Sequence, residues 1–207
     1  MKRTSLAILA TLLMMASTTF AGTSATNTNT VSPTLQISAT IVDAVQLTVT
    51  KGASASACAI ANGGAPPDYT MSFGTVDALA VSNAACGQKY TPAQTTADAI
   101  YYTDYQLNPV FASQPSVANP QINAYVSTPF ATANITVVRD SANSAAAPAA
   151  NGFSAMSTNV AAQDTIATAV ASGTPLTRYI GVDIAPTNGA TMPGAKTATV
   201  TFTLTVN

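Results

Sequence analysis

The most regular pattern in the sequence is the alternation at its C-terminal end, where threonine occupies every second position from 197 to 205. The apolar residues of this pattern are Ala198, Val200, Phe202, Leu204 and Val206. Successive side chains of a β-strand point to opposite faces of the sheet. The pattern therefore predicts a C-terminal strand with an apolar face to bury and a face of hydroxyl groups toward solvent.

A second alternating segment lies near the N-terminus. Its apolar residues are Leu35, Ile37, Ala39 and Ile41, and they alternate with polar residues. After a break at Asp43 the alternation resumes over residues 45–49, which predicts two strands or one strand with a bulge. Residues 22–33 carry no charge and are rich in Thr, Asn and Ser, so we expect a flexible arm there.

The interior of the chain gives shorter strand signals. Strands are predicted at residues 69–73, 76–81, 100–105, 122–126, 134–139 and 176–184. Five prolines between residues 88 and 129 are expected to confine strands there to short or edge positions. Segment 159–171 is compatible with a short helix or a weak strand. Roughly seven to nine short strands, with few helix-favouring residues, predict an all-β sandwich.

The N-terminus has the three parts of a secretory signal peptide. Lys2 and Arg3 precede an uncharged apolar stretch from Leu6 to Ala16, and small residues lead to Ala21. The stretch is shorter than the roughly 20 residues that cross a bilayer as a helix, although a retained anchor is the alternative. We expect residues 1–21 to be removed on export. No later segment is apolar and long enough to insert in a membrane.

Cys58 and Cys86 are the two cysteines of the chain. An even number of cysteines in an exported protein predicts one disulfide, formed in an oxidising compartment. The alternative is two free thiols or a metal pair. The sequence contains no histidine, which disfavours zinc, and we expect no metal or other cofactor.

The charge of the chain is low and slightly acidic. Seven Lys and Arg, two of them in the signal peptide, stand against eight acidic residues, all of them Asp. Binding to nucleic acid needs a concentrated basic surface, which this composition lacks. Acidic membrane surfaces are disfavoured for the same reason.

The residue types of the chain give little support to a catalytic function. Without histidine, neither a Ser-His-Asp nor a Cys-His arrangement can form. The carboxylate pairs Asp98 with Asp104 and Asp68 with Asp77 are expected to be loop and turn residues. The cluster Tyr101, Tyr102 and Tyr105 fits strand packing better than a sugar or surface contact. We therefore expect a protein that is not an enzyme.

Several segments resemble those of one family. They are Met71–Thr75, Tyr179–Pro186, Met192–Gly194 and Thr197–Val206, together with the alternation from Leu35 to Val49. These segments look like the spore coat protein U-like pilins, which are secreted subunits of archaic chaperone-usher fimbriae. The chain departs from the family in the late position of Cys58 and in ending on Asn207 in place of an aromatic residue.

The resemblance implies a fold and a mode of assembly. It implies an immunoglobulin-like sandwich over residues 43–207 that lacks one strand and is completed by donor-strand exchange. Residues 22–42 would be the arm and donor strand, with Leu35, Ile37, Ala39 and Ile41 as the groove-filling side chains. The partners would be identical or related pilin subunits, a periplasmic chaperone and an outer-membrane usher. The location would be the periplasm in transit, then a surface fimbria serving adhesion or biofilm attachment.

The sequence allows two interpretations of the N-terminal alternation. In the first, residues 35–41 pair with another subunit. In the second, Leu35–Val49 is the first strand of its own sheet, and the protein is a self-complete sandwich that binds a carbohydrate or a surface. A hydrolase on the same sandwich is a more distant third.

Overall fold

The computed structural model describes residues 36–39, 44–64, 66–77, 83–90, 99–112, 119–132, 134–146, 152–185 and 194–206. The chain divides into two units, Met1–Thr40 and Ile41–Asn207. In the first unit the described residues are 36–39, which have no regular secondary structure and are exposed. Everything below concerns the second unit unless stated otherwise.

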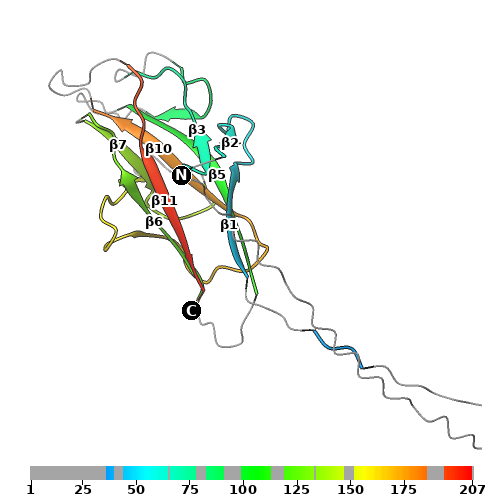
Figure 1. Ribbon diagram of the computed structural model, residues 1–207. Coiled ribbons are helices and arrows are strands. Elements are labelled where there is room, and N and C mark those ends of the chain that lie inside the picture. Colours follow the sequence, from blue (N-terminus) through cyan, green and yellow to red (C-terminus); the bar gives the residue numbers. More distant parts are fainter. Residues whose placement is uncertain are drawn as a thin grey trace, which may run out of the picture. The chain divides into compact units, whose positions relative to one another are not determined.

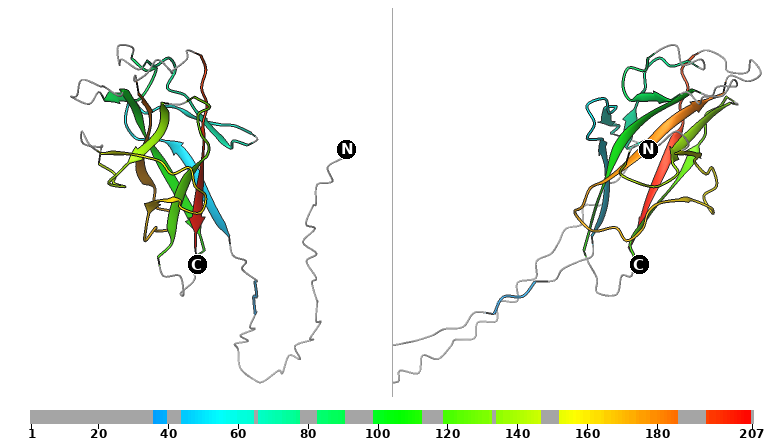
Figure 2. Two further views of the ribbon diagram at one scale, coloured as in Figure 1. Left: turned by 90° about the vertical axis from the view of Figure 1, so that its left-hand side faces the viewer. Right: turned by 180° about the vertical axis from the view of Figure 1, so that it is seen from behind.

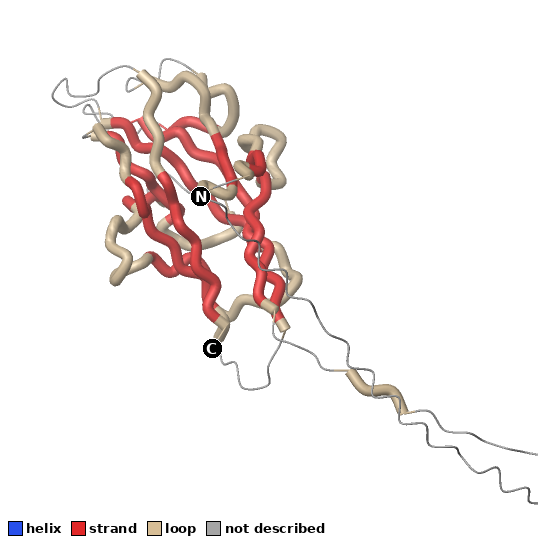
Figure 3. Tube along the Cα trace, viewed as in Figure 1, coloured by secondary structure: helices blue, strands red, loops and turns tan. Residues whose placement is uncertain are grey.

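The described residues form β-strands and loops, with no helix among them (Figure 3). The strands are β1 (Val45–Lys51), β2 (Ile60–Asn62), β3 (Tyr69–Met71), β4 (Gln88–Tyr90), β5 (Ala99–Phe111), β6 (Gln121–Thr128), β7 (Ile135–Asp140), β8 (Phe153–Ala155), β9 (Asp164–Ala167), β10 (Leu176–Ile184) and β11 (Thr199–Thr205). The predicted all-β class is confirmed. Segment 159–171, for which the sequence allowed a short helix or a weak strand, contains β9.

The strands pair antiparallel in three sheets. The large sheet has the order β1-β5-β10-β7-β8, and β4 also pairs with β5 (Figure 1). The small sheet has the order β11-β6-β9, and β2 pairs with β3 in a separate two-stranded sheet. In both larger sheets, strands far apart in sequence are neighbours.

The large and small sheets lie face to face (Figure 2), and residues of both form one hydrophobic core. Strand β6 shows how the sequence builds it, because Ile122, Ala124 and Val126 are buried while the residues between them are partly exposed. From the large sheet, β5 adds Tyr105 and Leu107 to the same cluster. This arrangement of antiparallel sheets around a common core is consistent with a β-sandwich.

Strand β5 corrects the expectation that proline keeps the strands of this region short. It is 13 residues long and lies between β1 and β10, although it contains Pro109. The backbone N–H of Phe111 points to Ser172, so the nitrogen of Pro109, two residues earlier, lies on the same side. The pairing of β10 with β5 ends at Leu107, so the missing donor of Pro109 interrupts no ladder hydrogen bond.

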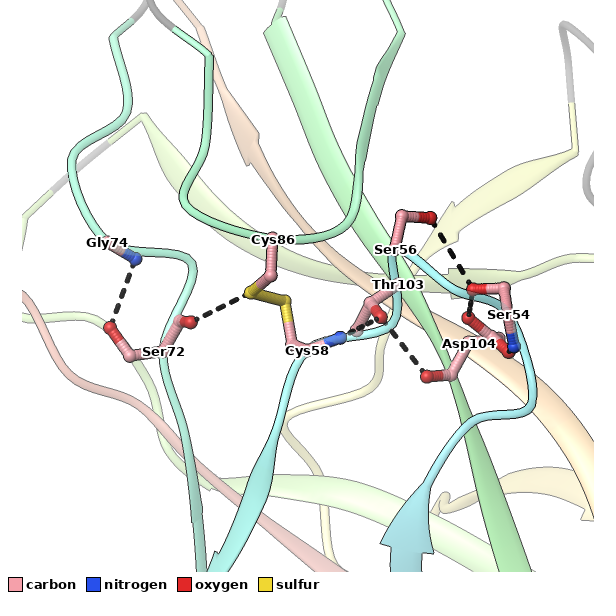
Figure 4. The surroundings of a disulfide bond; sticks show 8 residues. All are labelled: Ser54, Ser56, Cys58, Ser72, Gly74, Cys86, Thr103 and Asp104. Carbon is pink, nitrogen blue, oxygen red and sulfur yellow. Dashed lines mark hydrogen bonds between the residues drawn. A yellow bond between two sulfur atoms is a disulfide. The ribbon is translucent and has the colours of Figure 1, made fainter.

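The predicted disulfide between Cys58 and Cys86 is present (Figure 4). It lies in a second, smaller core with Phe73, Ala99 and Tyr101. The backbone N–H of Cys58 also donates to the Thr103 hydroxyl at 2.9 Å, which ties this loop to β5. The disulfide thus joins the loop after β1 to the loop before β4.

Some short elements differ from the sequence-based expectation. Strands β2, β4 and β8 were not predicted. Of the predicted strand 76–81, Val76 and Asp77 are not in a strand, and residues 78–81 lie outside the described residues. Each unpredicted strand has three residues, too few to show a period.

Candidate strand-addition site

Strand β11 ends the small sheet and carries the apolar residues singled out from the sequence. It is hydrogen-bonded to β6 on one edge, and within the described residues no strand pairs with its other edge. Val200, Phe202 and Leu204 pack against the shared core but are only partly buried. Val206 follows the strand and is also partly buried. The inner face of β11 is therefore less completely covered than that of β6.

Strand β1 ends the large sheet in the same way. It pairs with β5, with Leu47 opposite Pro109 and Val49 opposite Leu107. Leu47 and Val49 pack against the shared core and are partly buried. In the part of the chain that the structure describes, the second edge of β1 forms no strand ladder.

Contacts between the sheets show that β1 and β11 lie at the same side of the sandwich. The ring of Phe202 on β11 lies 5.7 Å from that of Tyr105 on β5. Strand β5 is the neighbour of β1 in the large sheet (Figure 1). At the other end of the small sheet, β9 contacts β7 and β10. We call the pair β1 and β11, with the inner side chains Leu47, Val49, Val200, Phe202 and Leu204, the open edge.

The opposite side of the sandwich is closed by polar contacts and by the segment after β8, which is hydrogen-bonded to strands of both sheets. Arg139 on β7 forms an ion pair with Asp164 on β9 at 2.8 Å, and both side chains are mostly buried. Arg178 on β10 donates from Nε to the Ile166 carbonyl at 3.0 Å. After β8, Ser157 accepts a backbone hydrogen bond from Val126 of β6. The open edge has no such closure among the described residues, so the two sides of the sandwich differ.

The Arg139–Asp164 pair makes the stability of this closed side dependent on pH. Burial opposes the ionisation of Asp164, but the hydrogen bonds from Arg139 and the Ser157 N–H outweigh it and hold the pKa of Asp164 below its usual value. The stabilisation is full above the unfolded pKa of about 4, and it is lost as the pH falls through the lower folded value. We expect Asp164→Asn to lower the free energy of unfolding by about 1–2 kcal/mol at neutral pH.

The test is urea unfolding of both proteins at several pH values. The stability difference between them should shrink steadily below about pH 4. Burial raises the pKa of Asp140, which acts in the opposite direction, but Asp140 is present in both proteins and cancels in the difference. A difference that stays constant from pH 7 to the acid limit would contradict the assignment.

The structure places only part of the predicted donor segment. The side chain of Ile37 is 84% exposed and Ala39 is also exposed. Leu35 and Ile41 lie outside the described residues.

The tyrosine cluster predicted on β5 is divided between the two faces of the sheet. Tyr101 and Tyr105 are buried, in agreement with strand packing. Tyr102 faces outward, with its ring 4.9 Å from that of Phe153 and 6.4 Å from that of Tyr179. Its hydroxyl donates to Gln88 of β4.

Asp104 and Asp77, two of the aspartates considered as carboxylate pairs, have structural roles. The buried Asp104 accepts hydrogen bonds from the backbone N–H and the hydroxyl of Ser54. The backbone of Asp77 exchanges hydrogen bonds with the Tyr101 hydroxyl. Asp68 is exposed in a loop, and Asp98 lies outside the described residues.

The sequence predicted only part of the open edge and none of the contacts of the closed side. The alternation over 45–49 predicted a strand, but its place at the end of a sheet depends on a pairing with β5 about 60 residues later. Arg139 and Asp164 gave no signal, because single charges in a polar segment do not reveal a partner on another sheet.

Protein-family models, curated proteins and solved structures give no match to this sequence. Within the described residues, no three His, Cys, Asp or Glu side chains gather in a way that would hold a metal ion. The same residues include no helix of the length and apolarity that crossing a bilayer requires.

Proposed function

We propose that the protein is a structural subunit of a surface fimbria and that its subunits polymerise by donor-strand exchange. The observation that carries the proposal is the open edge, where two sheets end side by side with partly exposed apolar inner faces. An unpaired strand edge is a template for another strand. A strand added beside β11 would satisfy its free backbone groups and cover Val200, Phe202 and Leu204.

The donor in this proposal is the N-terminal segment of another copy. Its apolar residues Leu35, Ile37, Ala39 and Ile41 have the period of two that one face of an added strand requires. Complete burial of Leu35, Ile37 and Ile41 would contribute about 1.5–3 kcal/mol each. The exposure of Ile37 supports the proposal, since the side chain is available to a second molecule.

The rest of the proposal comes from the N-terminal sequence and from the resemblance to the pilins. The domain would be an immunoglobulin-like sandwich over residues 43–207 that lacks one strand, with residues 22–42 as arm and donor. Export through the signal peptide 1–21 would deliver it to the periplasm, where a chaperone and an outer-membrane usher would handle it. On the cell surface the filament would serve attachment, with no catalytic role for the subunit.

A pair of substitutions in the donor segment tests the proposal against a self-complete sandwich. Ile37→Asp would place a charge on the inserted face, where it has no partner, whereas Ser38→Asp would place the same charge on the outer face. We expect Ile37→Asp to lower the yield of SDS-resistant multimers about tenfold or more, and Ser38→Asp to leave it close to wild type. The measurement is gel electrophoresis of unheated samples of the exported protein.

The two substitutions have the same charge and neighbouring positions, so their comparison separates insertion from general effects of charge. Equal yields of multimers from both variants would refute donor-strand exchange through this face. A wild-type protein that stays monomeric under all conditions would favour the self-complete sandwich.

A further inference from the structure

The outer face of the small sheet carries a polar trough of about 390 Å³. Its floor comes from neighbouring strands, and the turn before β9 forms its wall. The lining residues are Gln121, Asn123, Val160, Ala161, Ala162, Gln163, Thr165, Thr203 and Thr205. The trough is polar and wide open to solvent, so a ligand would lie along it and would not be enclosed.

Most of the hydrogen-bonding side chains on the floor of the trough are unused. The side chains of Gln121, Asn123, Thr165, Thr203 and Thr205 form no hydrogen bond with any described residue. Two other pairs of outward polar side chains are hydrogen-bonded to each other, Thr201 with Ser127 and Asn108 with Thr50. Within the described residues, the trough therefore gathers several unpaired donors and acceptors in one place.

The wall of the trough is held in place by its own hydrogen bonds. The backbone N–H of Ala161 donates to the Asn159 side-chain oxygen at 2.9 Å, and that of Ala162 to the Asn159 carbonyl at 3.0 Å. Gln163 donates from its amide to the Val160 carbonyl at 3.2 Å. A turn fixed in this way loses little conformational freedom when a ligand binds.

The chemistry of the lining points to one class of ligand. It contains carboxamides and hydroxyls, which donate and accept at once, and no charged side chain. A phosphate or sulfate ligand would call for Arg or Lys. The side chain of Val160 is 61% exposed at the wall and offers an apolar contact for C–H groups. We propose that the trough binds an uncharged oligosaccharide through the free side chains of Gln121, Asn123, Thr203 and Thr205.

This site is separate from the open edge. Thr203 and Thr205 face outward from β11, whereas Phe202 and Leu204 face the core. The trough belongs to the folded unit and does not depend on strand addition. If the subunits polymerise as proposed above, each copy presents the same trough, and weak sites repeated along a filament bind a glycan surface with high avidity.

Saturation-transfer difference NMR on the full exported chain tests the site. The probes are cellotetraose, maltotetraose and chitotriose, with a heparin tetrasaccharide as the charged comparison, each at about 5 mM to reveal millimolar affinities. We expect signals from at least one neutral probe. Asn123→Ala, and Ala161→Trp, which places a bulky ring at the wall, should each weaken its binding about tenfold.

The control variant is Asn108→Ala, which removes an outward carboxamide from β5 and should leave binding unchanged. No signal from any neutral probe, signals from heparin alone, or binding unaffected by both trough variants would each overturn the proposal. Ile37→Asp should keep the sugar affinity per subunit even where it removes multimers. The failure of donor-strand exchange and the failure of the sugar site are therefore distinguishable.

Discussion

Deleting residues 22–42 is expected to abolish SDS-resistant multimers and filaments altogether. The deletion removes the whole segment proposed to add beside β11, so every copy keeps an unfilled open edge. The loss should exceed that of Ile37→Asp, because the backbone ladder disappears with the side chains. Unheated gel electrophoresis and negative-stain electron microscopy measure it. Filaments formed by the shortened chain would show that another segment or surface joins the subunits.

A synthetic peptide gives the deletion its control. A peptide of residues 34–42 added to the shortened chain should fill the open edge, raise the melting temperature and give a one-to-one complex without any ladder. The same peptide carrying Ile37→Asp should bind far more weakly, because the charge would be buried without a partner. Equal stabilisation by both peptides would contradict insertion of the Ile37 face.

The parts of the fold predicted from sequence are those in which a local pattern decides the structure. The regular alternation of β11 requires one buried face, and the structure places Val200, Phe202 and Leu204 toward the core. The alternation over 45–49 predicted β1 for the same reason. The cysteine count predicted the disulfide because the chain offers one possible pair.

Other features depend on contacts between distant segments and leave no local trace. The length of β5 depends on where β10 stops pairing, which decides whether Pro109 costs a hydrogen bond. The open edge is defined by the order of strands in two sheets, and period alone does not give that order. The polar trough likewise combines Asn123 of β6 with Thr203 of β11. These two residues are paired in the sheet but lie 80 positions apart in the sequence.

Loss of the disulfide is expected to have the largest effect on the stability of the subunit itself. Cys58 and Cys86 are 28 positions apart, and closing a loop of this length stabilises a fold by about 3–4 kcal/mol through the reduced entropy of the unfolded chain. Cys58 is fully buried among Phe73, Ala99 and Tyr101, so this smaller core also loses packing when both cysteines become alanine. Urea unfolding of the double variant should show this decrease.

The comparison of oxidised and reduced wild-type protein separates the two contributions. Reduction removes the cross-link and keeps the sulfur atoms in the core, so it should reproduce the entropic part of the loss. The double alanine variant should be less stable than reduced wild type, because only the variant loses the buried sulfur packing. Both proteins should still bury the larger core shared by the two sheets, because all the fully buried residues of that core lie outside the disulfide loop. Reduced protein as stable as the oxidised form would mean that the hydrogen bond from Cys58 to Thr103 and the surrounding packing already hold the loop in place.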